Sequence, residues 1–95
     1  MTAALQATEA YVQKCKFEFV NEDGVTKSGM ARIGIKTVLA NGATVSYHFR
    51  SRRFRVVSAA GRRSDSLSYR QLKDRFSPAI VQAAADGLEM ALSME

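Results

Sequence analysis

Apolar and polar residues alternate with a period of two along much of the chain, a pattern that predicts β-strands. The first such stretch begins at residue 15, and the side chains on its apolar face are Cys15, Phe17 and Phe19. Alternation of this kind is typical of a half-buried strand. Residues 21–24, Asn-Glu-Asp-Gly, follow as a turn, because Gly24 can adopt a positive φ. Residues 25–30 alternate poorly, so the register of this first hairpin stays open.

A second hairpin has a register that the apolar pattern can decide. Alternating apolar residues flank Asn41-Gly42 on both sides. A two-residue turn there would send the two apolar sets to opposite faces. A three-residue loop over residues 40–42, with Gly42 in the left-handed region, aligns them and pairs Leu39 with Ala43. The other pairs on that face are then Thr37 with Val45, Ile35 with Tyr47 and Ile33 with Phe49.

A third turn, at Ser51-Arg52, extends the sheet into a meander. We expect two residues to close this turn. The inward-facing pairs are then Phe49 with Phe54, Tyr47 with Val56 and Val45 with Ser58. The outward-facing pairs are Arg50 with Arg53 and His48 with Arg55. The aromatic residues of these strands are therefore predicted to be core residues rather than a platform for stacking bases.

Helices are predicted at both ends of the chain. Residues 2–14 are rich in Ala, Leu, Gln and Glu and carry apolar residues at helical spacing. Asp65 or Ser66 can cap a short helix, whose shared face would be Tyr69, Leu72 and Phe76. Ser77-Pro78 begins another helix, because proline suits the first helical position. The apolar stripe of this last helix consists of Ile80, Val81, Ala84, Leu88, Ala91 and Leu92.

These elements predict one α+β domain over residues 1–95. Its expected parts are an N-terminal helix, a four-stranded antiparallel meander and two C-terminal helices packed on one face of the sheet. No stretch approaches the ~18 apolar residues of a membrane helix, and the N-terminus lacks a basic region followed by an apolar one. We therefore expect a cytoplasmic protein with no membrane partner.

The basic residues are concentrated in the middle of the chain. The 14 Lys and Arg against 9 Asp and Glu give a net charge of +5. Residues 27–63 hold nine of the basic residues and no acidic one, and the six between residues 50 and 63 are all arginine. The planar guanidinium group suits phosphate better than an ammonium group does. This distribution favours an anionic partner.

The leading hypothesis is a small binding module, not an enzyme, whose basic sheet face engages nucleic acid or a nucleoprotein. Binding largely through phosphate predicts weak sequence specificity. The proposed contact residues are Arg32, Lys36, His48, Arg50, Arg52, Arg53, Arg55, Arg62 and Arg63. The plainer alternative is that these cations only keep an exposed sheet soluble.

Catalytic and metal chemistry has little support in the sequence. A single Cys and a single His exclude a disulfide within the chain and the usual Cys/His zinc sites. Cys15 falls in the apolar phase of its strand and is predicted to be buried and inert. His48 has no evident catalytic partner, and the serines of residues 64–68 have no neighbouring histidine. We therefore predict no catalytic residue, no metal and no cofactor.

Two other interpretations stay open. A small protein inhibitor or adaptor, of the kind found in phages and mobile elements, would dock the same arginines onto an acidic protein surface. A homodimer would form through the Ala-rich last helix or through a sheet edge.

Overall fold

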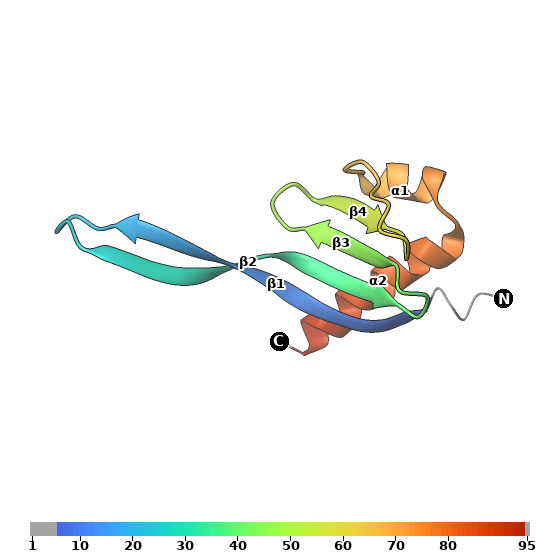
Figure 1. Ribbon diagram of the computed structural model, residues 1–95, viewed down its shortest axis with the longest axis horizontal. Helices are drawn as coiled ribbons and strands as arrows, with labels where there is room; N and C mark the ends of the chain where they lie inside the picture. Colours follow the sequence, from blue (N-terminus) through green and yellow to red (C-terminus); the bar gives the residue numbers. More distant parts are fainter. Residues whose placement is uncertain (1–5, 95) are drawn as a thin grey trace.

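The computed structural model describes residues 6–94, in which an antiparallel sheet is followed by two helices (Figure 1). The four strands are neighbours in chain order: β1 (Ala7–Val20), β2 (Thr26–Leu39), β3 (Thr44–His48) and β4 (Arg53–Val57). The helices are α1 (Tyr69–Arg75) and α2 (Pro78–Ser93). The predicted α+β class, the four-stranded meander and the two C-terminal helices are confirmed.

The predicted N-terminal helix is wrong, because β1 occupies most of that segment. Residues 7–14 are extended and pair with β2, with Ala10 opposite Thr37 and Val12 opposite Ile35. The first part of the predicted helix, residues 2–5, lies outside the described residues. Helix propensity is a weak preference. Here tertiary contacts override it, because the segment pairs with β2 and buries Ala10 in the core.

The core lies between α2 and one face of the sheet, which we call the inner face. Leu39, Val45, Phe54 and Val56 of the sheet are buried together with Ile80, Ala83 and Ala84 of α2. A second cluster joins Ala10, Ile35 and Ala91. Tyr47 and Phe49 pack against these clusters, so the prediction that they belong to the core is confirmed. The opposite face of the sheet is called the outer face.

The first two turns have the chemistry that their sequences indicate. In the first hairpin Val20 pairs with Thr26, and Gly24 has a φ of +77°. In the second, the Leu39 N–H donates to the Ala43 carbonyl over 2.8 Å, and Gly42 has a φ of +91°. The three-residue loop at residues 40–42 is therefore confirmed, with Thr37 opposite Val45 and Ile35 opposite Tyr47 as predicted.

The predicted register between β3 and β4 is wrong by two residues. The observed pairs are His48 with Arg53, Tyr47 with Phe54, Ser46 with Arg55 and Val45 with Val56. Residues 49–52 form a longer loop, in which Arg52 has a φ of +58°. A shift of two residues keeps every side chain on its face, so the inward and outward sets are unchanged. Arg50 does not face Arg53 across the sheet, and His48 does not face Arg55.

The cap of α1 also differs from its prediction. Ser68, rather than Asp65 or Ser66, caps the helix, and its hydroxyl accepts from the Gln71 N–H. The Gln71 side chain accepts from the Ser68 N–H in return, which completes a capping box. α2 begins at Pro78 after Ser77, as predicted. Within residues 6–94, no helix is both long and apolar enough to cross a membrane.

Beyond β3, the two longest strands continue as a two-stranded projection, which we call the ribbon and define as residues 14–32 (Figure 1). A bulge at Ile33 marks its base, because Gln13 pairs with Gly34 and Lys14 pairs with Arg32. The ribbon gives the molecule a length of 59 Å against 25 and 23 Å in the other directions. Cys15 is exposed there, so its predicted burial is wrong.

Candidate functional site

The outer face of the sheet, opposite α2, carries basic side chains from three strands. Cross-strand pairing places one row across all four strands, formed by Tyr11, Lys36, Ser46 and Arg55. The next row is formed by Gln13, Gly34, His48 and Arg53. Directly opposed residues of neighbouring strands point to the same face. The predicted outward position of Lys36, His48, Arg53 and Arg55 is therefore observed.

A hollow of about 340 Å³ opens between these rows. Its polar lining comprises Gln13, Ser46, His48, Ser51, Arg53, Arg55 and Ser66. Among residues 6–94, no Asp or Glu lines it. Gln13, Ser46 and Ser51 were not among the predicted contact residues. The signal that could have found Gln13 and Ser46 is their alternation with the core residues Val12, Val45 and Tyr47.

A second hollow, of about 630 Å³, lies at the base of the ribbon. Its lining comprises Ala31, Arg32, Ile33, His48, Phe49, Arg50 and Ser51. The bulge places Ile33 where it lines both hollows, and His48 and Ser51 are shared as well. The two hollows therefore adjoin at His48 and together collect Arg32, His48, Arg50, Arg53 and Arg55, although residues 32 and 55 are far apart in the sequence.

Arg53 is held by contacts within the protein. Its Nε donates to the Ser66 hydroxyl over 3.0 Å, and its Nη2 donates to the Ser66 carbonyl and to the Gln71 side chain over 2.8 and 3.1 Å. These bonds fasten the loop before α1, and the first residues of α1, to the edge of β4. Arg53 thus shapes the wall of the hollow, and most of its hydrogen-bonding capacity is already used.

The four other predicted residues lie around the hollows rather than in their linings. Lys36 is half-buried in the row that also holds Ser46 and Arg55. Arg52 is exposed in the β3–β4 loop. Arg62 is exposed in the tight loop that Ser58 closes, and Arg63 pairs with the outer-face residue Val57. The structure therefore brings five of the predicted residues into two adjoining hollows and leaves four at the periphery.

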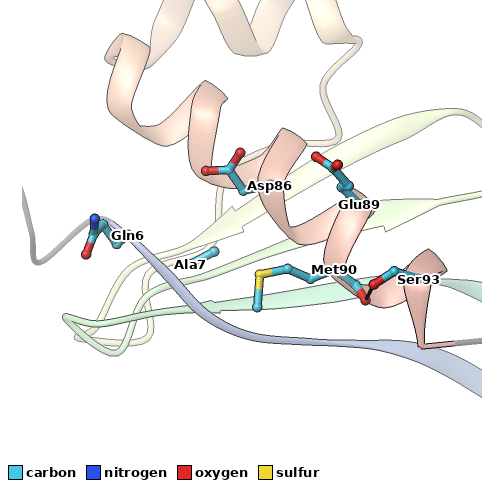
Figure 2. Close-up of a pocket in the computed structure, with 6 residues that line it drawn as sticks. All are labelled: Gln6, Ala7, Asp86, Glu89, Met90 and Ser93. Atoms are coloured by element: carbon cyan, nitrogen blue, oxygen red, sulfur yellow. Dashed lines mark hydrogen bonds between the residues drawn. The ribbon is translucent and has the colours of Figure 1, made fainter.

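The acidic residues of α2 lie away from this basic face. Figure 2 shows Asp86 and Glu89 on α2 beside a hollow of about 560 Å³, which is also lined by Gln6 and Ala7 at the start of β1. Met90 and Ser93 complete the lining, and the Ser93 hydroxyl donates to the Met90 carbonyl over 2.9 Å. Because α2 packs on the inner face, Asp86 and Glu89 lie on the opposite side of the sheet from the basic hollows.

The site can bind an anion by hydrogen bonding and charge. Guanidinium and imidazole groups donate hydrogen bonds, and the described residues that line the two basic hollows include no carboxylate. Within residues 6–94, no group of three or more His, Cys, Asp or Glu side chains could hold a metal ion.

Fold and site together define a small α+β protein with a basic, arginine-lined sheet face. No protein-family model, curated protein or solved structure matches the chain.

Proposed function

We propose that the protein is a non-enzymatic module that binds nucleic acid, alone or in a nucleoprotein, through the outer face of its sheet and mainly through phosphate. The observation that carries this proposal is the pair of adjoining hollows, which gather four arginines and His48 and have no Asp or Glu among the described residues that line them. The acidic side chains Asp86 and Glu89 belong to α2, on the far side of the sheet, where they do not repel a phosphate bound at the hollows.

The spacing of cations on the face supports contact with an extended polyanion. Lys36 and Arg55 stand in one row with Ser46 between them, so two strand spacings of ~4.8 Å separate them by about 10 Å. Cations at such a distance can contact different phosphates of one strand. Arg50 and Arg52, in the loop at the end of β3, extend the basic surface beyond the sheet.

The predicted contact residues have different parts in this proposal. Lys36, Arg50 and Arg55 are the principal phosphate contacts, and Arg32 and His48 complete the hollow at the ribbon base. Arg52, Arg62 and Arg63 contribute positive charge from the periphery. Arg53 is a positioning residue, because its guanidinium already holds Ser66 and Gln71.

Salt dependence of binding tests the proposal directly. Labelled DNA and RNA oligonucleotides would be titrated by fluorescence anisotropy at several salt concentrations. Log affinity is expected to fall linearly with log salt, by about 0.7–0.9 for each phosphate contact. The double variant Lys36→Ala/Arg55→Ala is expected to reduce that slope by about 1.5.

A matched variant removes the same charge elsewhere. Arg70→Ala/Arg75→Ala takes two cations from α1 that line neither hollow, and it is expected to leave the slope nearly unchanged. Binding without a salt slope, or an equal loss in both double variants, would contradict the proposal. A partner that is recovered from a lysate after nuclease treatment would instead favour docking onto an acidic protein surface.

A further inference from the structure

The ribbon displays two aromatic rings that no described helix covers. Phe17 and Phe19 are 43% and 47% exposed. Their ring centroids lie 5.9 Å apart, and the ring planes are inclined by only 20°. Figure 1 shows the ribbon extending away from α1 and α2. The alternation that predicted a half-buried face here therefore produces an exposed aromatic face.

The residue opposite Phe17 explains how its ring lies. Phe17 pairs with Gly29, and a Cβ added to Gly29 would come within 2.8 Å of the Phe17 Cζ atom. The ring thus lies over Gly29, and a side chain at residue 29 would displace it from this position. The ring covers part of the partner strand, and enough of Phe17 remains exposed to contact a ligand.

These rings belong to a line of aromatic residues on the outer face. Residues of one strand that differ by an even number share a face, so Tyr11, Phe17 and Phe19 point the same way along β1. Tyr11 is also exposed, at 41%, and it stands in the row with Lys36 and Arg55. From Tyr11 to Phe19 the line covers eight residues, or about 26 Å.

A lysine stands across from the aromatic residue at each end of the line. Tyr11 pairs with Lys36, and Phe19 pairs with Lys27. Aromatic rings on one strand with cations on the neighbouring strand offer base stacking and phosphate contact together, as single-stranded nucleic acids require. The line begins beside the basic hollow, because Gln13, two residues after Tyr11, lines it.

From this arrangement we infer that the outer face of β1 and β2 is a stacking platform for a single-stranded nucleic acid. Bases stack on Tyr11, Phe17 and Phe19, while Lys27, Lys36 and the basic hollows hold the phosphates. The inference rests on the proposed function and specifies its ligand. Duplex bases keep their faces stacked inside the helix, so a duplex can use the basic hollows but not the rings.

Two features favour this ligand over a second copy of the chain. The right-handed twist of a two-stranded ribbon turns the aromatic line as it leaves the sheet, and a flexible single strand can follow that path while a stiff duplex cannot. A two-fold pairing of this face would also bring Lys27 and Lys36 of both copies to one interface, where like charges repel.

Anisotropy titrations with labelled single-stranded and duplex oligonucleotides of equal length test the inference, with DNA and RNA as separate arms. The wild-type protein is expected to bind the single strand at least tenfold more tightly. Phe17→Leu/Phe19→Leu keeps apolar side chains but removes the rings. It is expected to weaken single-strand binding about tenfold per ring, with an unchanged salt slope and little effect on duplex binding.

Two further variants separate stacking from simple loss of structure. Phe17→Tyr/Phe19→Tyr retains the rings and is expected to bind as the wild-type protein does. Val20→Ala/Met30→Ala removes exposed apolar groups from the other face of the ribbon, where these residues are 66% and 61% exposed, and is expected to leave binding unchanged. Circular dichroism of each variant verifies that the sheet is formed.

The outcomes distinguish this inference from the proposed function. If the wild-type protein binds no nucleic acid at all, the proposed function fails, and the inference fails with it. Equal affinity for duplex and single strand, unaffected by Phe17→Leu/Phe19→Leu, overturns the inference alone. A wild-type dimer in light scattering that this variant dissociates, without loss of nucleic-acid affinity, shows that a second copy covers the rings and also overturns it.

Discussion

Gly87 in the middle of α2 lies directly against Thr37 near the end of β2, with no room between them for a methyl group. Both residues are buried, so this contact sets how closely the helix approaches the sheet. The nearby alanines Ala83, Ala84 and Ala91 are buried along the same helix. The small residues of α2 are therefore explained by close packing within the chain.

Gly87→Ala is expected to lower the free energy of unfolding by about 1–3 kcal/mol, because overpacking a buried contact outweighs the better helix propensity of alanine. Adding Thr37→Ala removes two of the three Thr37 atoms nearest to the new methyl group. The double variant should thus lose less stability than the sum of the two single variants. Urea denaturation measures all three, and strict additivity would argue against the contact.

Arg53 and Arg55 are neighbours on the outer face, and we expect substitutions at the two positions to have different effects. Arg53→Ala removes three hydrogen bonds to Ser66 and Gln71 and is expected to cost about 1–3 kcal/mol of stability. Arg55→Ala, at an exposed position, should change stability by less than about 0.5 kcal/mol but weaken nucleic-acid binding. Thermal unfolding and anisotropy, run on both variants, would reveal any reversal of these roles.

Arg52 adopts a backbone conformation that glycine would adopt at lower cost. Its φ of +58° places it in the left-handed region, where a side chain costs about 1 kcal/mol. Arg52→Gly is therefore expected to raise stability by up to about 1 kcal/mol while weakening nucleic-acid binding. Arg50→Gly removes the same charge from the same loop without relieving a positive φ, so it should not stabilise the fold. Equal stability changes in the two variants would refute this explanation.

The exposure of Cys15 predicts fast chemical labelling of the folded protein. As the single cysteine of the chain, it should react fully with a maleimide under native conditions, at a rate near that of the urea-unfolded protein. Mass spectrometry follows the reaction over time. Labelling that requires denaturant would show that the ribbon face is covered in solution.

Much of the fold could be predicted because the apolar alternation is unambiguous where α2 covers one face. The loop at residues 40–42 was predictable since a one-residue error would have sent Ile35 or Tyr47 into solvent. The length of the β3–β4 loop was not predictable in this way, because a two-residue shift in the pairing of β3 with β4 leaves Val45, Tyr47 and Phe54 facing the core. The alternation of apolar residues shows which side chains face the core. It does not fix the length of a loop when two registers place the same side chains on the same faces.

The ribbon and β1 show a second limit of sequence patterns. Cys15, Phe17 and Phe19 alternate like the core residues of β3, and nothing local indicates that they lie on the face of the sheet opposite α2. Residues 7–14 have good helix formers, and only the pairing of β1 with β2 makes them extended. The basic residues of the outer face were predictable because, in β2, β3 and β4, they alternate with apolar residues that α2 covers on the inner face. The exposure of the aromatic line depends on which face of the sheet a distant helix covers.

The two edges of the sheet differ in a way that bears on how the protein behaves at high concentration. The edge of β4 is occupied by the following chain, with Leu67 bridged to Phe54 and Arg63 bridged to Val57. Along β1, the described residues pair on one side only, over 14 residues. The charges of Lys14, Lys16 and Glu18 discourage strand addition there. We therefore expect these three charges to protect the protein from filament formation. Neutralising them would leave a long unpaired strand edge, next to exposed phenylalanine rings, open to pairing with another molecule.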